Sequence, residues 1–205
     1  MKIAVCTTHS PAYAEVAAVT MPVMEAYCER HGYSFHEIKV EDNKWAYKKH
    51  GFFKELFETD VDAVLHIDVD AVFTNFNTKI EDFIDQEHDY FITKDFNELN
   101  TGNIILKNTD NGKWINEIIL SQIDCFENEQ NAVNWLMGNP GFNQRVKIVP
   151  HPSLNSYQYS LYKECSELVG KTELGDWTEG CFILHVPALP ISKRAEILND
   201  VKIIE

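Results

Sequence analysis

Residues 63–73 read AVLHIDVDAVF, and this stretch says most about the fold. Its apolar start has the length of a buried β-strand, and two carboxylates, Asp68 and Asp70, follow directly. Residues i and i+2 of an extended chain face the same way, so both acids are expected on one face at the strand end. Such a pair is repulsive unless a cation or a hydrogen-bond donor lies between the carboxylates. A hard divalent cation fits it, whereas two solvated turn aspartates are the plainer alternative.

Short apolar runs alternate with segments of helical periodicity on both sides of this stretch. Strands are expected at residues 2–7, 34–40, 63–67, 90–93, 103–107, 146–149 and 181–186, and helices at residues 12–31, 47–58, 80–84, 114–119 and 132–137. Pro22 is expected to kink the first helix. The alternation predicts an α/β fold with a mostly parallel sheet flanked by helices. Ligands of such sheets usually bind beyond the carboxyl ends of the strands, so motifs at those ends carry most information.

The charge balance restricts the partners. The 205 residues include 18 lysines and arginines against 32 aspartates and glutamates, a formal net charge of −14. This excess of acid excludes nucleic acid held by a general phosphate field and argues against an anionic membrane surface. A phosphorylated ligand therefore needs local positive charge, for which a bound divalent cation is the obvious source. The length predicts one domain, residues 1–205.

The sequence also indicates a compartment. Its five cysteines are scattered and show no CxxC spacing, so neither a zinc site nor a disulfide framework is suggested. No window reaches the roughly 18 apolar residues of a membrane span, and residues 1–16 make a poor signal peptide. We therefore expect reduced thiols, a cytoplasmic location and no direct membrane insertion.

Residues 63–73 are similar to the DxD motif of GT-A-fold glycosyltransferases, whose strand-end acids hold Mn²⁺ against a nucleotide-sugar diphosphate. Four further segments resemble, in order, those of the galactosyl-/xylosyltransferase family (family 34): Trp45 with Lys48 or Lys49, LNTGNIILKNTDNGKWINEI at 99–118, ENEQNAVNWLM at 127–137, and EGCFILHVPALP at 179–190. The resemblance implies a GT-A-like (Rossmann-like) domain. Its nucleotide-binding half would be about residues 1–75, and its donor-sugar and acceptor half about residues 76–205.

The resemblance implies transfer of a hexose or pentose from a nucleotide sugar, expected to be a UDP-sugar, to a carbohydrate or glycoconjugate acceptor. Relatives retain the anomeric configuration and use Mn²⁺ (or Mg²⁺). Asp70 resembles a direct metal ligand, and Asp68 a contact to the ribose or donor sugar or a water-mediated partner of the metal. His185 resembles the third metal ligand, a role that neutral imidazole can fill. A core histidine bonded to backbone is the plainer interpretation.

The remaining implied site residues fall into a few groups. They are Thr7 and Thr8 at the nucleotide, Asn100, Thr101 and Gly102 at the donor sugar, Glu129 and Gln130 near the reacting anomeric carbon, Lys48 in the tryptophan–lysine segment, and Lys193 toward the diphosphate. An ordinary turn at 100–103 and an acid that complements a helix dipole at Glu129 are the plainer alternatives. Asn128 stands where the family has a second acid, and two prolines separate His185 from the next bases, Lys193 and Arg194.

The stretch 151–177 has no clear apolar period. Its aromatic residues, Tyr157, Tyr159, Tyr162 and Trp177, either form an exposed loop that stacks on an acceptor sugar or cover the sheet edge.

Two rival functions remain open. A phosphatase of the haloacid dehalogenase class would use Asp68 as nucleophile and Asp70 as acid/base with Mg²⁺. Its motif normally lies on the first strand, whereas about sixty residues precede it here, and its late acidic motif is missing. A non-catalytic sugar- or nucleotide-binding module is the other rival, because Asn128 replaces an acid.

Overall fold

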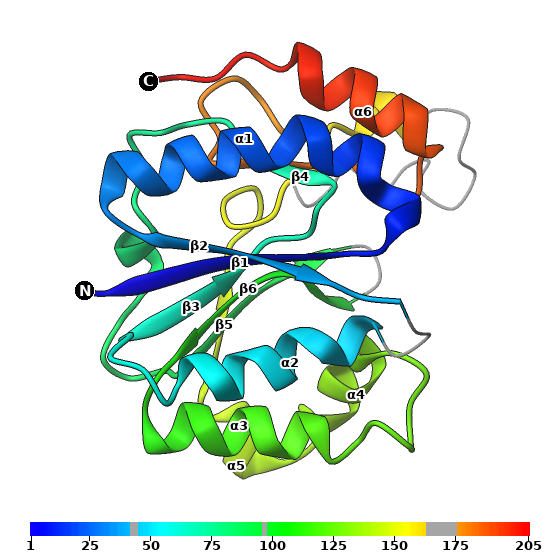
Figure 1. Ribbon diagram of the computed structural model, residues 1–205. Helices are drawn as coiled ribbons and strands as arrows, with labels where there is room; N and C mark the ends of the chain where they lie inside the picture. The colour runs from blue at the N-terminus through cyan, green and yellow to red at the C-terminus, as the bar shows by residue number, and fades with distance from the viewer. Residues whose placement is uncertain (42–44, 96–97, 163–175) are drawn as a thin grey trace.

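A six-stranded mixed sheet forms the middle of the molecule (Figure 1). The computed structural model describes residues 1–41, 45–95, 98–162 and 176–205. In sheet order the strands are β2 (Ser34–Lys39), β1 (Ile3–His9), β3 (Ala63–His66), β6 (Glu98–Lys107), β5 (Tyr90–Asp95) and β7 (Val146–Val149). Three of the strand pairs are parallel, and only β6 runs antiparallel to its neighbours. The predicted α/β class with a mostly parallel sheet is therefore confirmed.

Helices cover both faces of the sheet. On one face α1 (Ala14–His31) lies beside α6 (Ile191–Asp200), and on the other lie α2 (Trp45–Leu56), α3 (Asp110–Leu120), α4 (Glu129–Leu136) and α5 (Pro140–Asn143) (Figure 1). Three short 3₁₀ turns, η1 (Pro11–Tyr13), η2 (Ile80–Phe83) and η3 (Tyr159–Tyr162), complete the helical segments of the described residues. No described helix combines the length and the apolar character that crossing a bilayer requires.

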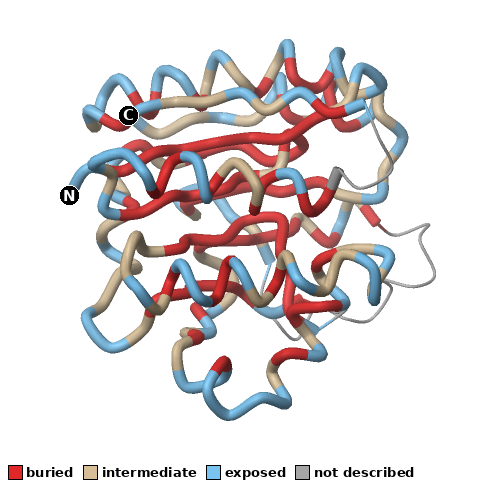
Figure 2. The backbone as a smooth tube through the Cα atoms, turned by 60° about the horizontal axis from the view of Figure 1, so that its bottom comes forward, coloured by how far each residue is buried: buried red, intermediate tan, exposed pale blue. Residues whose placement is uncertain are grey.

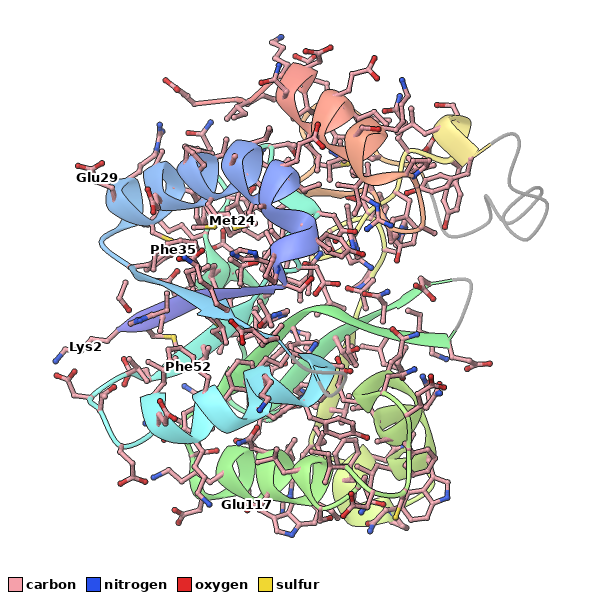
Figure 3. All side chains as sticks on the ribbon, turned by 45° about the vertical axis from the view of Figure 1, so that its right-hand side comes forward. Lys2, Met24, Glu29, Phe35, Phe52 and Glu117 are labelled. Atoms are coloured by element: carbon pink, nitrogen blue, oxygen red, sulfur yellow. The ribbon has the colours of Figure 1, made fainter. Side chains whose placement is uncertain are left out.

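The sheet separates two apolar cores. In Figure 2 the segments that run through the middle of the molecule are mostly buried. Successive residues of a strand face opposite sides, so Ala63 and Leu65 of β3 join the core under α1, and Val64 joins the core under α2 and α3. Met24 of α1 points toward the sheet in Figure 3, whereas Glu117 of α3 points outward. Because both faces of β3 are packed in apolar cores, the strand rigidly supports the segment that follows it, which carries Asp68 and Asp70.

A turn after β3 carries the chain into a second, two-stranded sheet. The amide of Ala71 donates to the carbonyl of Asp68 (2.9 Å), and β4 (Ala71–Phe73) then pairs antiparallel with β8 (Ile183–His185). The register places Ala71 opposite His185. The amide of Val186 also donates to the carbonyl of Asp70 (3.0 Å). Residues more than a hundred positions apart in sequence thus meet at the end of β3.

Several elements differ from the sequence predictions. β6 begins at Glu98, so residues 100–102 belong to a strand rather than to a turn. Pro22 lies inside α1, which continues to His31. Strand β4 and helices α5 and α6 have no counterpart among the predicted elements. In the 151–177 stretch Tyr157, Tyr159 and Tyr162 are buried, so the exposed aromatic loop is wrong for these three side chains; residues 163–175 lie outside the described part.

Candidate active site

Asp68, Asp70 and His185 form a group at the end of β3 that could hold a metal ion. Each offers one ligand atom, and these atoms all lie within 4.8 Å of one another. His185 Nε2 is 3.2 Å from Asp70 Oδ1 and 3.7 Å from Asp68 Oδ2. No other such group of three occurs among the residues that the structure describes. Two carboxylates and an imidazole suit a borderline-hard divalent ion such as Mn²⁺.

The orientation of His185 favours a ligand role. Its Nδ1 lies 2.9 Å from Asn155 Oδ1, an amide oxygen that can only accept, so Nδ1 donates. The amide of Asn155 is itself oriented by Asn103, whose Nδ2 donates to the same oxygen (3.2 Å). His185 Nε2 is buried and makes no hydrogen bond within the described residues, although it faces both carboxylates. A buried nitrogen left without a hydrogen bond and aimed at two acids is what a metal ligand requires.

The three groups also shift one another's protonation. Burial raises the pKa of Asp68, and the Asp70 charge adds to this against the opposing Lys49 ammonium. Burial would raise the pKa of Asp70 too, but His185 and Arg194 outweigh it and lower the pKa. Burial would lower the pKa of His185, but the two aspartates outweigh it and raise the pKa. The group therefore attracts positive charge, whether a proton or a metal ion.

Backbone contacts hold the two aspartates in place. The amide of Asp68 donates to Asn103 Oδ1 on β6 (3.2 Å), and the hydroxyl of Thr20 on α1 donates to the carbonyl of Val69 (2.8 Å). Asp70 is buried, whereas the side chain of Asp68 is 25 % exposed. The carboxylate of Asp68 thus faces the open side of the group.

Gly102 makes room for this group. A Cβ at this position would lie 2.5 Å from Asp68 Oδ2, 2.9 Å from Asn100 Oδ1 and 2.9 Å from His185 Cε1. Its amide donates to Asn100 Oδ1 (2.9 Å), and its carbonyl lies 2.9 Å from Nδ1 of His66. Because two of the three crowded atoms belong to candidate metal ligands, only glycine fits here without displacing them.

A cavity of about 290 Å³ opens beside the group at the carboxyl ends of β1 and β3. Its walls come from the end of β1 and the segment after it, the residue after β2, the segment after β3, the segment after β8 and α6: Thr8, His9, Ser10, Tyr13, Val40, Asp68, Val69, Asp70, Pro187, Ala188 and Arg194. The predicted Thr8 thus lines this cavity. Thr7 is fully buried and is not among the lining residues, and its hydroxyl has no hydrogen bond within the described part.

The late basic residue at the cavity is Arg194 rather than Lys193. Arg194 Nη1 lies 2.6 Å from Asp70 Oδ2, and both side chains are largely buried. Lys193 is half exposed, and its ammonium lies 3.0 Å from Glu196 on the same helix. The prediction named Lys193 for the diphosphate because it is the first basic residue after His185 in the sequence. Helix α6 turns the next residue toward the site instead.

A buried ion pair sits behind Gly102. Lys49 Nζ lies 2.5 Å from Glu129 Oε1 and donates to the carbonyl of Thr101 (2.6 Å), and the Thr101 hydroxyl donates to the same carboxylate (2.8 Å). Gln130 Oε1 accepts from the amide of Thr101 (3.3 Å). The predicted Thr101, Glu129 and Gln130 are thus brought together, but Lys48 is exposed and its neighbour Lys49 takes the inner position.

No family model and no curated protein sequence matches the chain. Solved structures do: a glycosyltransferase involved in glycosylation of the major capsid of PBCV-1 superposes with a TM-score of 0.75 at 20% identity, covering 97% of this chain and 98% of that one. The galactosyltransferase LgtC, in complex with donor and acceptor sugar analogues, gives a TM-score of 0.60 at 12% identity over 98% and 97%. This chain has the GT-A fold. Mouse xyloside xylosyltransferase 1 gives a TM-score of 0.58 at 7% identity, with 93% and 100% covered.

Within the GT-A chain, Asn100 belongs to a buried polar network beside the metal ligands. Its Nδ2 donates to Asp95 Oδ2 (2.8 Å) and to the hydroxyl of Tyr157 (3.0 Å). Tyr157 in turn donates to Asp95 (2.8 Å), and its ring centroid is 5.4 Å from that of His185. These contacts fix the side chain of Asn100, and its Oδ1 in turn accepts a hydrogen bond from the amide of Gly102.

Asn128, which replaces a family acid, has a local structural role. It is the N-cap of α4, and its Oδ1 accepts from the amide of Asn131 (2.9 Å). Asparagine is one of the best N-cap residues, so helix initiation accounts for it.

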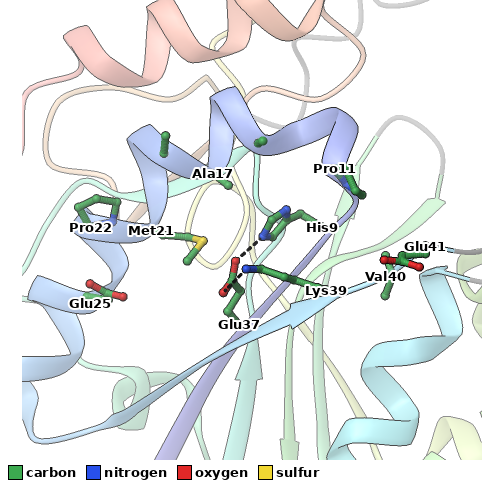
Figure 4. Close-up of a pocket in the computed structure, with 12 residues that line it drawn as sticks. His9, Pro11, Ala17, Met21, Pro22, Glu25, Glu37, Lys39, Val40 and Glu41 are labelled. Carbon is green, nitrogen blue, oxygen red and sulfur yellow. Dashed lines mark hydrogen bonds and ion pairs between the residues drawn. The ribbon is translucent and has the colours of Figure 1, made fainter.

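A second cavity, of about 530 Å³, lies between α1 and β2 (Figure 4). His9 and Val40 line both cavities. At its floor His9 Nε2 lies 2.7 Å from Glu37 Oε1, and Lys39 pairs with the same carboxylate (3.4 Å). The walls from α1 are mostly apolar.

Proposed function

We propose that the chain is a metal-dependent glycosyltransferase that moves a hexose or pentose from a nucleotide sugar, expected to be a UDP-sugar, to a carbohydrate or glycoconjugate acceptor with retention. The observation that carries this proposal is the group of Asp68, Asp70 and His185 beside a cavity at the strand ends, with His185 Nε2 left without a hydrogen bond. The GT-A fold shared with named glycosyltransferases supports it.

Asp70 and His185 would hold Mn²⁺ or Mg²⁺ directly, and Asp68 would bind it directly or through water or contact the donor. Bound there, the cation would neutralise the diphosphate leaving group and act as a Lewis acid. Thr8 would contact the nucleotide, and Thr7 would support it from the preceding position of β1. In this proposal residues 1–75 bind the nucleotide and residues 76–205 bind the donor sugar and acceptor.

The donor sugar would lie against the inner end of β6. Asn100, Thr101 and Gly102 are buried there, and the missing side chain of Gly102 lets Asp68 and His185 lie close to the backbone of β6. Glu129 and Gln130 start α4 behind it, and we place the reacting anomeric carbon near them. Because Lys49 holds the Glu129 carboxylate, that residue would act by its charge, whereas the partly exposed Gln130 would contact the sugar. Arg194 lines the cavity and would supply positive charge there, whereas the predicted Lys48 and Lys193 do not line it.

The compartment is also part of the proposal. The four cysteines in the described part, Cys6, Cys28, Cys125 and Cys181, are free thiols. They support a reducing, cytoplasmic location. The net charge of −14 supports a partner other than nucleic acid.

Thermal stabilisation by UDP tests the proposal. We expect UDP with Mn²⁺ to raise the melting temperature of the wild-type protein. Asp70→Ala should neither bind UDP with Mn²⁺ nor show this increase in melting temperature. Turnover of a generic phosphate ester that is lost in Asp68→Asn would contradict the proposal and support the phosphatase.

One observation keeps the non-catalytic module as a second candidate. Glu129, the acid that we place near the reacting anomeric carbon, is engaged by Lys49 and Thr101, and its side chain is 4 % exposed. If Mn²⁺ and UDP-sugar bind but no sugar is released to water or to varied acceptors, the chain is such a module.

A further inference from the structure

The guanidinium of Arg194 occupies one oxygen of a candidate metal ligand. Its Nη1 lies 2.6 Å from Asp70 Oδ2, while Asp70 Oδ1 faces His185 Nε2 at 3.2 Å. The two oxygens of this carboxylate are therefore divided, one toward the metal group and one toward a fixed cation. Asp70 and Arg194 are 9 % and 11 % exposed, so solvent screens the pair little.

Arg194 is itself held by its surroundings. Its Nε donates to the carbonyl of Leu189 (2.6 Å), and Nη1 also donates to the hydroxyl of Tyr13 (3.2 Å). The guanidinium carbon lies 5.3 Å from the centroid of the Tyr13 ring. The other amino group, Nη2, has no hydrogen bond within the described residues, and the side chain lines the 290 Å³ cavity. One end of the guanidinium thus faces Asp70, and the other is available to a ligand in the cavity.

We propose that Arg194 is a positioning residue that makes binding of the divalent cation depend on binding of the nucleoside diphosphate. This inference rests on the proposed function of the same site. The two aspartates carry two negative charges, and the guanidinium cancels one of them, so a lone divalent cation meets a site of reduced charge. A diphosphate in the cavity would pair with Nη2 and restore the negative charge that the cation needs. Cation and diphosphate then bind cooperatively, because each improves the electrostatics for the other.

The competing possibility is that Arg194 serves only to hold α6 in place. Removing a purely structural residue can only weaken the site. Removing the internal counter-ion, in contrast, strengthens binding of a lone cation and weakens its cooperation with the diphosphate. The two roles therefore predict opposite changes for the cation alone.

The Mn²⁺ affinity is measured with and without UDP by titrating the protein with Mn²⁺ and monitoring the electron paramagnetic resonance signal of the free ion. For the wild type we expect UDP to raise the Mn²⁺ affinity at least about tenfold. For Arg194→Gln we expect Mn²⁺ alone to bind about tenfold more tightly, and the increase due to UDP to fall by a similar factor. Arg194→Lys keeps the charge, so its lone-cation affinity should stay close to that of the wild type.

Lys202→Gln is the matched control, because it removes one surface cation that pairs with Glu179 close to α6. We expect it to change neither Mn²⁺ affinity nor the effect of UDP. If Arg194→Gln leaves lone Mn²⁺ affinity unchanged or lower while UDP still promotes Mn²⁺ binding, the inference is wrong and the proposed function stands.

Two further results keep the inference testable if Arg194→Gln does not fold. A wild-type protein that binds Mn²⁺ equally well with and without UDP contradicts the inference without any variant. A wild-type protein that binds neither Mn²⁺ nor UDP contradicts the proposed function, and the inference with it.

Discussion

At the scale of single residues, the site depends on a position with no side chain. Gly102 lies where a Cβ would overlap Asp68 Oδ2 and crowd His185 Cε1. A real Cβ would have to push these two groups apart, and candidate metal ligands tolerate little displacement. Glycine is therefore needed at position 102 because the Asp68 carboxylate lies close to the backbone there, and not because the backbone has a positive φ.

Gly102→Ala is expected to lose metal-dependent UDP binding by at least about tenfold, because it displaces groups that must converge on one ion. Calorimetric titration of UDP in the presence of Mn²⁺ measures the loss. Gly51→Ala is the control: nothing lies within 4 Å of its Cβ position, and it sits inside α2. We expect it to bind as the wild type does and to be more stable by about 1 kcal/mol. Equal UDP affinity for Gly102→Ala and wild type would contradict the role given to Gly102.

Sequence reasoning found some site residues and missed others for identifiable reasons. The aspartate pair is visible because i and i+2 positions at a strand end share a face. Lys49 could have been preferred to Lys48, because Lys49 and the buried Phe53 are four residues apart and share a helix face. Arg194 could not be chosen over Lys193, because its contact with Asp70 joins positions 124 apart and depends on how α6 packs.

At the scale of elements, the ion pair of Lys49 and Glu129 fastens α2 and α4 to β6. The ammonium also bonds to the Thr101 carbonyl, so three elements meet at one buried charge pair. Taking charges out of water is costly, and removing one partner leaves the other uncompensated. The pair consequently fixes the position of Thr101 and the start of α4, where the proposed function places the donor sugar.

Lys49→Met is expected to lower the free energy of unfolding by about 3–5 kcal/mol, because it strands the buried Glu129 carboxylate. The double variant Lys49→Met/Glu129→Gln removes both charges and should recover a substantial part of this loss. Urea denaturation of the two variants and the wild type gives the comparison. A double variant at least as unstable as Lys49→Met would mean that the charge pair is not the cause.

The strand β6 shows where element prediction failed. Asn100 and Gly102 have the composition of a turn, and that composition predicts a turn here. In the fold both lie within a long strand, and Asn100 is opposite Thr93 in a pairing whose register shifts near this point. The irregular register brings polar residues to the site while the backbone stays extended. Local composition cannot reveal such a tertiary pairing.

At the scale of the whole molecule, stability should depend on pH through buried histidines. Burial, together with the neighbouring Lys49 charge, lowers the pKa of His50 to about 4. Burial also lowers the pKa of His66. The unfolded chain therefore binds protons that the folded protein does not, between about pH 6.5 and pH 4. The stability that His50 and His66 contribute is fully present above this window and is lost as the pH falls through it, whereas the raised pKa of His185 acts in the opposite direction.

For His50 alone the expected loss is about 2 kcal/mol between pH 7 and pH 5. Urea denaturation at a series of pH values measures it. His50→Gln keeps a donor for Asn116 Oδ1, which lies 2.7 Å from His50 Nδ1, but does not titrate. The pH dependence of this variant should be flatter by up to one proton across the window. The same slope in variant and wild type would show that His50 is protonated in the fold.

The net charge of −14 acquires a local meaning in the fold. Asp68 and Asp70 place negative charge at the cavity in which a diphosphate would bind, so the site should repel that ligand until a cation arrives. The general excess of acid excludes classes of partner, whereas the position of these two acids predicts metal-dependent binding.

The most direct test of the central claim is release of UDP from UDP-sugars by the purified protein, with Mn²⁺ and with a chelator. The proposed function predicts release with Mn²⁺, none with the chelator, and a rate at least about 100-fold lower for Asp70→Ala. Release that persists in the chelator, or that Asp70→Ala leaves unchanged, would contradict it.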